Sequence, residues 1–351
     1  MTPAVPPRAG RRSLAVPAWA TRALSALVAA LPAAIPAAIS AAIPATVLAA
    51  GYPEHPVTVV VPYPPGGGAD IFGRAIANAL QPGLKQTVLV ENKPGAGGNI
   101  GMAYVARAKP DGYTLGLGTI GTQTINQFLY SNMTFDPERD LVPIALVSTT
   151  PNVIAVSAKS PYKTVADVIK AAKQSPDKKL TYASPGIGSS VHLTGAYFES
   201  MAGVTMLHVP FKGTSASLPA VAGGQVDLLF DNLPGALAQI KDGNLVRGVA
   251  VTSGARDPSV PSLPTVAESG LPGFDVTAWF ALYAPRNTPA PVVQQLIDAA
   301  RSGLQSQAIA TNFATMGAKP GTLFGAELAA FESAERKKWG GLIKDKGITA
   351  Q

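Results

Sequence analysis

The chain has 351 residues, of which 47% are hydrophobic and 14% charged, and it contains no cysteine. This composition excludes a disordered chain, a disulfide scaffold, thiolate metal sites and cysteine nucleophiles. The formal charge is +7, but residues 1–50 carry four arginines and no acidic residue, which leaves 24 basic and 21 acidic residues elsewhere. Since the remainder is nearly balanced and has no basic stripe, we expect no nucleic acid partner. We expect no metal either, because the histidines do not cluster: His55, His192 and His208.

Residues 1–50 have the pattern of a secretory signal peptide. A basic start precedes an uncharged stretch, 27–50, made almost wholly of Ala, Leu, Ile, Val and Pro. We expect cleavage near Ala49 or Ala50 and export to the periplasm. A membrane anchor is the alternative, and prolines within the stretch argue against it because each removes a helical N–H. Two adjacent arginines near the start allow twin-arginine export, but the general secretory route is favoured.

From Tyr52 onward, short β-rich runs alternate with helical patterns. In chain order we expect strand 57–61, helix 71–80, strands 87–90 and 113–117, two extended runs between 144 and 157, helix 165–173, strand 180–183, helix 191–201, strand 206–209, helix 215–222, strand 226–230, helix 234–241 and strands 246–251 and 276–283. Thr164 and Asp167 form a capping box at the start of one of these helices. This alternation predicts an α/β protein with mostly parallel sheets and helices on both faces.

The C-terminal part departs from this alternation. Thr288 is the expected N-cap of a helix and Pro289 its first residue. The last helix, 324–343, pairs Glu332 with Arg336 on its outer face.

Two α/β units fit this order of elements. We expect a crossover near Pro151 and a return near 250–275. The predicted first domain is therefore discontinuous, with residues 51–150 and 265–351, and the second domain spans 151–264.

The loop Tyr63–Asp70 lies between the first strand and the first helix. Ligands of open α/β sheets bind at such strand ends, and a helix start favours an anion. We expect its glycines to let the backbone approach a ligand closely, with a positive φ at Gly67. The alternative is a simple turn with Asp70 as the N-cap. The candidate ligand contacts here are Tyr63, Gly66, Gly67, Gly68, Ala69 and Asp70.

A second loop, Ser184–Ser190, has the same position relative to its strand and helix. Ser189 or Ser190 serves as N-cap, as ligand hydroxyl, or as both, and His192 is more often packed than in contact with a ligand. The candidates here are Ser184, Gly186, Gly188, Ser189 and Ser190. Three further candidates complete the set: Thr119, Asp231 and Phe280. Turn formation explains Asp231 and Asn232 equally well, and Trp279 and Phe280 either wall the pocket or fill the core.

Signatures of catalysis fail on inspection. Gly116-x-Gly118-x-x-Gly121 matches a dinucleotide fingerprint, but it follows the third strand rather than the first, and 122–130 is poor in the small apolar residues that pack at such a helix start. The chain has no phosphate-binding P-loop and no G-x-S-x-G nucleophile elbow. Ser189 and His192 lack a third partner for a triad. We expect no catalytic residue.

Several motifs resemble those of the Bug (Bordetella uptake gene) proteins, the TctC-type solute receptors of tripartite tricarboxylate transporters. They are the runs 59–70 (VVVPYPPGGGAD), 91–98 (ENKPGAGG), 109–115 (KPDGYTL), 208–213 (HVPFKG) and 263–268 (LPTVAE). The resemblance implies a type II periplasmic binding protein fold, two α/β domains with a ligand cleft and crossing hinge strands, and neither catalysis nor a cofactor. It also implies that Tyr63–Asp70 and Ser184–Ser190 hold a ligand carboxylate through backbone N–H groups and hydroxyls.

The expected function is capture of a small carboxylate by hinge closure and its delivery to the membrane permease of such a transporter. A receptor of the same fold that feeds a sensor kinase is the alternative, and an enzyme with an oxyanion-type loop is a third, weaker hypothesis. We expect a monomer. The ligand is a mono-, di- or tricarboxylate, aromatic acids included.

Overall fold

The computed structural model describes residues 51–174 and 179–348, so the predicted signal peptide lies outside the described residues. Strand β1 (Val57–Val61) pairs in parallel with β2 (Val88–Asn92) and with β3 (Thr114–Thr119). The valines of β1 are buried, as expected for a parallel strand covered on both faces. With helix α2 (Gly68–Leu84) these strands form the first lobe.

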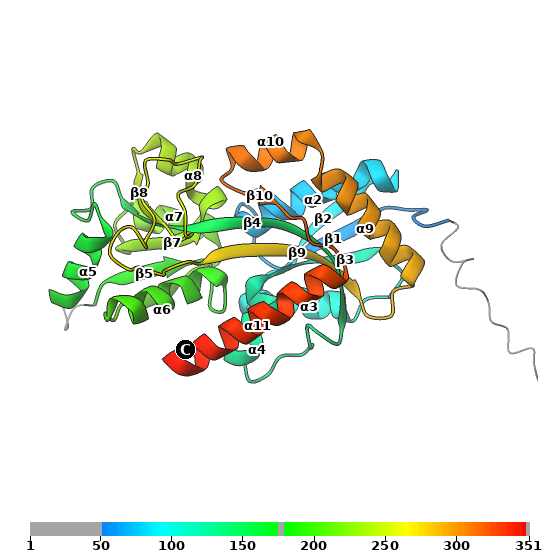
Figure 1. Cartoon of the computed structure of the whole chain (residues 1–351), viewed down its shortest axis with the longest axis horizontal. Helices are drawn as coiled ribbons and strands as arrows, with labels where there is room; N and C mark the ends of the chain where they lie inside the picture. Colours follow the sequence, from blue (N-terminus) through cyan, green and yellow to red (C-terminus); the bar gives the residue numbers. More distant parts are fainter. Residues whose placement is uncertain (1–50, 175–178, 349–351) are drawn as a thin grey trace, which may run out of the picture. The chain divides into compact units, whose positions relative to one another are not determined.

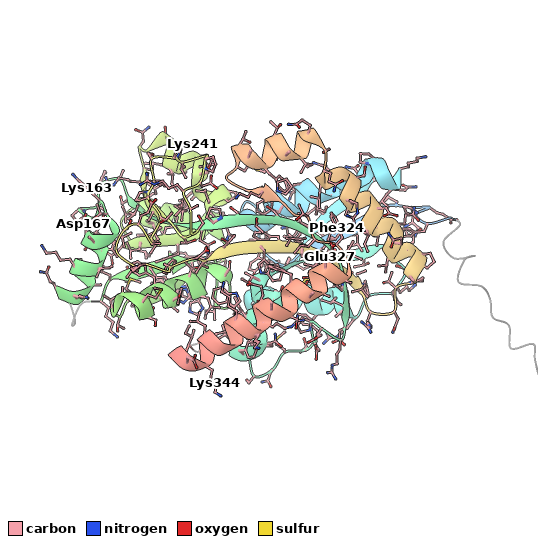
Figure 2. The ribbon with its side chains drawn as sticks, in the orientation of Figure 1. Lys163, Asp167, Lys241, Phe324, Glu327 and Lys344 are labelled. Atoms are coloured by element: carbon pink, nitrogen blue, oxygen red, sulfur yellow. The ribbon has the colours of Figure 1, made fainter. Side chains whose placement is uncertain are left out.

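The second lobe repeats this architecture. Strand β5 (Thr181–Ser184) lies between β6 (Leu207–Pro210) and β7 (Leu228–Asn232), again in parallel. Its helices are α5 (Val165–Gln174), α6 (Ser190–Ala202), α7 (Thr214–Ala222) and α8 (Leu233–Asp242). The predicted capping box is confirmed at α5, where the Asp167 N–H donates to Thr164 Oγ1 (3.1 Å) and the Thr164 N–H to the Asp167 carboxylate (2.9 Å). Figure 2 labels Asp167 at this helix start.

Two long strands join the lobes, and Figure 1 shows them running side by side from one lobe into the other. They are β4 (Leu141–Ser157) and β9 (Thr277–Pro285). The prediction of two runs between 144 and 157 is wrong, since β4 is continuous. It pairs with β9 as far as Pro151, and from Asn152 onward with β7 and with β8 (Val246–Val251).

These crossing strands also correct the expectation of mostly parallel sheets. β4 is antiparallel to β7, β8 and β9, and β9 is antiparallel to β3, so parallel pairing holds only within each lobe. The strand order is β2-β1-β3-β9-β4-β7-β5-β6. The described residues fall in one compact unit, and the domain boundaries stay a prediction.

The C-terminal segment packs around the first lobe and the crossing strands. It contains α9 (Ala290–Leu304), α10 (Gln307–Thr315), β10 (Lys319–Pro320) and α11 (Ala326–Lys346). Helix α9 begins one residue later than predicted: Pro289 is its N-cap, and the Thr288 hydroxyl donates to the Pro285 carbonyl instead of capping the helix. Many α9–α2 contacts cover one face of the first lobe.

The predicted pairing of Glu332 with Arg336 is confirmed, but its place on the outer face of α11 is wrong. The side chains are only 4% and 12% exposed, with 3.8 Å between them. Glu332 accepts a short hydrogen bond from the buried Tyr283 hydroxyl of β9. One helical turn further along α11, Glu335 accepts hydrogen bonds from the indole N–H groups of Trp279 (3.1 Å) and Trp339 (3.0 Å). Polar side chains of α11 thus anchor the helix to a crossing strand.

Sequence periodicity misses α10 and α3 (Asn99–Ala106). Helix α3 has no single apolar stripe, because Ile100 and Tyr104 are exposed while Met102 and Val105 are buried. The segment after β3 was also not predicted as helical. It forms a π-helical turn, Gly121–Ile125, that continues into α4 (Asn126–Leu129).

We expect Glu332→Ala to destabilise the protein by about 1–3 kcal/mol, because the buried Tyr283 hydroxyl loses its acceptor. Glu327→Ala is the control on the same helix: Glu327 is exposed near the start of α11 (Figure 2) and its loss costs at most about 1 kcal/mol. Urea unfolding of both variants measures the difference. Equal losses in the two variants would contradict a structural role for the buried carboxylate.

Candidate functional site

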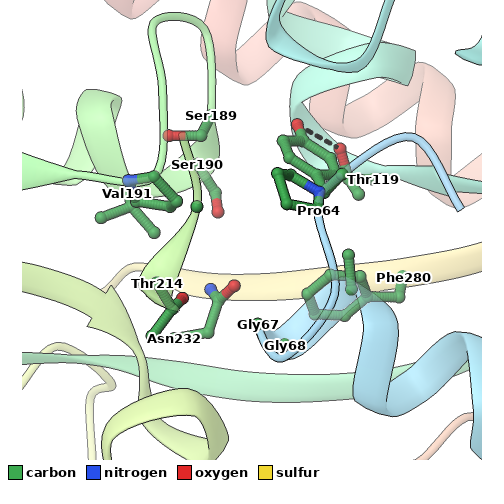
Figure 3. Close-up of a pocket in the computed structure, with 14 residues that line it drawn as sticks. Pro64, Gly67, Gly68, Thr119, Ser189, Ser190, Val191, Thr214, Asn232 and Phe280 are labelled. Carbon is green, nitrogen blue, oxygen red and sulfur yellow. Dashed lines mark hydrogen bonds between the residues drawn. The ribbon is translucent and has the colours of Figure 1, made fainter. Parts of the chain in front are cut away.

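A pocket of about 410 Å³, counted out to its open mouth, lies between the lobes at the carboxyl ends of their parallel strands. Ligands of open α/β sheets bind at this edge. Figure 3 shows Ser190, Thr214 and Asn232 on one side and Pro64, Thr119 and Phe280 on the other. The predicted site residues that line the pocket are Tyr63, Gly67, Gly68, Ala69, Thr119, Ser189, Ser190 and Phe280. The other lining residues are Pro64, Pro185, Val191, Gly213, Thr214 and Asn232.

Of the described helices, four begin at this pocket. Their N-cap residues are Gly67 for α2, Ser189 for α6, Gly213 for α7 and Asn232 for α8, and all of them line the pocket. The first N–H groups of a helix have no partner within the helix, and the helix dipole makes this end positive. None of the described lining residues carries a charged side chain. The pocket therefore favours an anion through backbone groups rather than through an ion pair.

Helix α7 was expected, but its role at the site was missed. Gly213 and Thr214 follow strand β6 and open α7, the same strand–loop–helix pattern that singled out the other two loops. That repeated pattern is the signal that sequence reasoning had available. Val191, in the first turn of α6, was missed because its apolar side chain has no chemical signature.

The first loop corrects two expectations. Gly67, not Asp70, is the N-cap of α2, and its φ of −92° is an ordinary value, whereas Gly66 takes the positive φ of 90°. Asp70 does not line the pocket. Its carboxylate accepts from the Gly66 N–H (3.1 Å), from Asn92 Nδ2 (3.0 Å) and from Arg74, which also forms an ion pair with it (3.0 Å). Burial alone would raise the pKa of Asp70, but the hydrogen bonds from Arg74, Gly66 and Asn92 outweigh burial and lower that pKa.

The glycines of the first loop allow the two lobes to approach. A Cβ atom at Gly67 would lie 3.0 Å from Thr214 Oγ1, and one at Gly68 would lie 2.9 Å from Asn232 Oδ1. A second contact between the lobes is a hydrogen bond of 3.0 Å from the Tyr130 hydroxyl to the Ile187 carbonyl. The two lobes therefore contact each other beside the pocket.

The serines of the second loop have different roles. Ser189 Oγ donates to the Gly186 carbonyl (2.7 Å) and accepts from the His192 N–H (3.2 Å), so it caps α6 and its hydrogen is in use. The Ser190 hydroxyl points toward the pocket in Figure 3, and the Ser190 carbonyl accepts from the Thr194 hydroxyl. Ser184 lies behind the loop, where its hydroxyl meets His208 Nε2 at 2.7 Å.

The remaining members of the loop lie beside the pocket rather than in it. Gly186 lines an adjoining groove, and Gly188 faces Asn126 of the first lobe. His192 is packed rather than exposed to the pocket, stacked on His208 with 4.2 Å between ring centroids. Burial lowers the pKa of His192 to about 4, and burial together with His192 lowers that of His208 to about 3. Both imidazoles are therefore neutral at physiological pH.

Phe280, Tyr63 and Thr119 form the first-lobe wall. Phe280 walls the pocket and also packs against Phe72 of α2, whereas Trp279 points away and packs on Phe331 of α11. The Tyr63 hydroxyl donates to the Gly97 carbonyl (2.9 Å) and lies 3.4 Å from Thr119 Oγ1. Burial raises the pKa of Tyr63 to about 12, so it stays a neutral donor.

Asn232 belongs to a buried chain of amides and hydroxyls that reaches the second loop and a crossing strand. Its Nδ2 donates to Asn152 of β4 (2.6 Å), Asn152 Nδ2 donates to Thr194 Oγ1 (2.7 Å), and Thr194 donates to the Ser190 carbonyl (2.8 Å). Asp231 lies directly beneath this layer and does not line the pocket itself. Hydrogen bonds therefore link the pocket to the crossing strand β4.

Two other features bear on the class of protein. Within residues 51–174 and 179–348, no three His, Asp or Glu side chains are grouped as a metal ion would require. No helix in the same ranges combines the length and apolarity needed to cross a membrane.

We expect Ser189→Ala and Ser190→Ala to have different effects. Loss of the cap at Ser189 lowers stability by about 1 kcal/mol without ligand. Ser190→Ala leaves the apo melting temperature nearly unchanged but weakens carboxylate binding about 10-fold or more, because a hydrogen bond to a charged group contributes about 1.5–3 kcal/mol. Melting and calorimetry of both variants measure this. Unchanged affinity in Ser190→Ala would leave the second loop with backbone N–H groups alone.

The comparisons with known proteins agree with this geometry. The family model of the tripartite tricarboxylate transporter family receptor matches residues 72–348. Protein BugT of Bordetella pertussis is 33% identical over 302 residues, 86% of this chain and 92% of BugT. Two solved structures superpose closely: Rpa4515 of R. palustris with adipate (35% identity, TM-score 0.81, 85% of this chain and 99% of that one) and MatC (Rpa3494) of Rhodopseudomonas palustris with bound malate (32%, 0.79, 83% and 100%).

These likenesses confirm the predicted type II periplasmic binding protein fold, with two α/β domains and a cleft between them. The matched region includes most of α2, the crossing strands and α11. The chain therefore belongs to the tripartite tricarboxylate transporter receptor family and is a receptor of the Bug and TctC type.

Proposed function

We propose that the protein is a periplasmic receptor that captures a small carboxylate and delivers it to the permease subunits of a tripartite tricarboxylate transporter. The observation that carries this proposal is the convergence of the helix N-termini of α2, α6, α7 and α8 on a pocket lined by uncharged residues. Such a site binds an anion with directed N–H groups. The family supplies the transporter as the partner.

Binding and hinge closure are coupled in this proposal. The N–H groups come from both lobes, so a carboxylate contacts all of them only when the lobes are closed. The ligand therefore shifts the population toward the closed form by its differential affinity. β4 and β9 are the crossing strands through which this motion passes, and Asn152 of β4 is hydrogen-bonded to Asn232 at the pocket.

The site accommodates more than one carboxylate group. The pocket shares Tyr63, Pro64 and Pro185 with an adjoining groove of about 1090 Å³, counted out to solvent, in which Lys212 is exposed. A dicarboxylate would place one end at the helix N-termini and extend the other into the groove. The relatives solved with adipate and with malate support this class of ligand.

We infer no catalysis. A serine nucleophile needs a base that accepts its proton. The hydroxyl of Ser189 donates to a backbone carbonyl, and Nδ1 of His192 faces the Gly188 N–H at 3.4 Å. The neutral imidazole of His192 therefore contacts the loop backbone and does not act as a base for a serine hydroxyl.

A melting-temperature screen of the mature protein against mono-, di- and tricarboxylates tests the proposal. An acid present at 100 times its Kd stabilises the folded protein by about 2.7 kcal/mol. Calorimetry on the best acids, adipate and malate among them, then gives their Kd values. No stabilisation by any acid of the panel would overturn carboxylate capture.

Gly67→Val is the variant matched to this screen. Its φ tolerates valine, so the fold persists, but the added side chain meets Thr214 and fills the N-terminus of α2, which should abolish binding. Gly341→Val in α11 is the control, since a Cβ atom there meets no neighbour within 4 Å, and it should bind normally. Normal affinity in Gly67→Val would move the site elsewhere.

We propose that residues 1–50 direct export and are removed. The intact mass of the protein recovered from the periplasm tests this, and we expect a mature N-terminus near Ala49 or Ala50. A mass that retains the first arginines would favour a membrane anchor instead.

A further inference from the structure

Asp231 is a buried carboxylate directly beneath the pocket. It occupies the carboxyl end of β7 and is 0% exposed. Its Oδ1 accepts from the hydroxyl of Thr214 (3.1 Å) and from the N–H of Asn232 (2.8 Å), and both of these residues line the pocket. Its Oδ2 is buried and has no hydrogen-bond partner within the described residues. A buried carboxylate with an unpartnered oxygen is costly unless protonation of the group removes its charge.

The charged groups on the elements around Asp231 do not compensate its charge. Thr214 and Gly235 face it from α7 and α8, and Val153 pairs with it from β4. The charged side chains of α8, Lys241 and Asp242, are exposed at its far end.

The charged side chains on the other neighbouring elements interact with residues other than Asp231. Asp227, before β7, accepts from Thr181 of β5. Across the pocket, Asp70 and Arg74 of α2 pair with each other. The imidazole of His208 stacks on Tyr182 and on His192. Tyr182 packs on Phe230, which lies on the face opposite to that of Asp231 because successive strand residues alternate.

The direction of one hydrogen bond decides what the pocket offers a ligand. While Asp231 is ionised, the Thr214 hydroxyl donates to it, so only oxygen lone pairs of Thr214 face the pocket. Lone pairs repel a carboxylate. We propose that Asp231 is protonated whenever a carboxylate is bound in the pocket, so that an ionised Asp231 takes up one proton from solvent on binding, and that this proton turns the Thr214 hydroxyl into a donor toward the ligand.

The proton balance is simple. The proton adds to a lone pair of Oδ1, the new O–H donates to Thr214 Oγ1, and the hydroxyl hydrogen of Thr214 is released to the ligand oxygen. Two carboxyl groups on either side of Thr214 then share one negative charge instead of holding two. This deepens the proposed function, on which it rests, by naming Asp231 as a positioning residue that makes binding proton-coupled.

The free protein is poised for this step. Burial, opposed by the bonds from Thr214 and Asn232, raises the pKa of Asp231 to about 7. A bound carboxylate raises that pKa further, because like charges disfavour ionisation. Proton uptake is therefore largest above about pH 7, where the free side chain is ionised, and affinity falls as pH rises through that range.

Calorimetry with adipate and with malate in phosphate and in Tris, which differ in ionisation enthalpy, counts the protons taken up. At about pH 8 we expect uptake approaching one proton per acid bound, and at about pH 6 much less. Between about pH 7 and about pH 9 we expect the affinity to fall by up to roughly tenfold per pH unit. At about pH 8 both acids are fully ionised, so the proton taken up there does not titrate the ligand.

Asp231→Asn keeps the shape and cannot be protonated, so its binding should involve no proton uptake and be independent of pH. Thr214→Ser should retain the uptake, and Thr214→Ala should bind more weakly at about pH 6, where the wild-type hydroxyl donates. Asp242→Asn is the control at the exposed end of α8 and should behave as wild type. Uptake that persists in Asp231→Asn would assign the proton to another group, such as Glu332, whose burial raises its pKa to about 7.

The outcomes separate the two proposals. Tight binding of adipate or malate to the wild type without proton uptake at about pH 8 overturns the role of Asp231 and leaves the receptor function standing. This measurement needs no variant, so a misfolded Asp231→Asn protein does not affect it. Absence of binding by every acid in the carboxylate panel overturns the receptor function and, with it, this inference.

Discussion

The antiparallel pairing of β4 with β9 is the constraint on which the rest of the structure depends. These strands carry the chain between lobes that are otherwise built from parallel strands, and β4 changes partners between Pro151 and Asn152. A proline at this point has no N–H for a ladder, so the change of partner costs no donor. α11 is hydrogen-bonded to β9 through Glu332 and Glu335, which holds one crossing strand against a long helix.

The pocket follows from the parallel strands of the two lobes. A parallel strand must be followed by a crossover, and here that crossover begins with a helix whose free N–H groups face the carboxyl edge of the sheet. Placing two such edges against each other brings the starts of α2, α6, α7 and α8 together. An anion site then arises without a lysine or arginine, and Asp70 helps by holding the first loop through Gly66 and Asn92.

Hydrogen bonds between buried polar groups hold the elements around the pocket in place. Asn152, Thr194 and Asn232 satisfy one another in a chain from the crossing strand to the loop serines. The Tyr130 hydroxyl closes the lobes on the Ile187 carbonyl. Asp231 differs from these groups, because its Oδ2 is buried without a donor among the described residues. In the same part of the chain, Gln123, Asn126, Arg247 and Ser259 also have a buried side-chain atom without a partner, but the other oxygen of Asp231 is bonded to Thr214 and Asn232, which line the pocket.

Local sequence pattern predicted the strands, most helices, the anion-friendly loops Tyr63–Asp70 and Ser184–Ser190, and the family resemblance. It could do so because strand runs, capping residues and glycine-rich turns act over a few neighbouring residues. Tertiary structure alone decided three other matters. It made β4 a single strand, buried Glu332 under Tyr283, and brought Thr214 and Asn232 to the pocket beside Gly67 and Gly68. These depend on contacts between residues more than a hundred positions apart or on which face of a helix meets another element, and no local spacing encodes that choice.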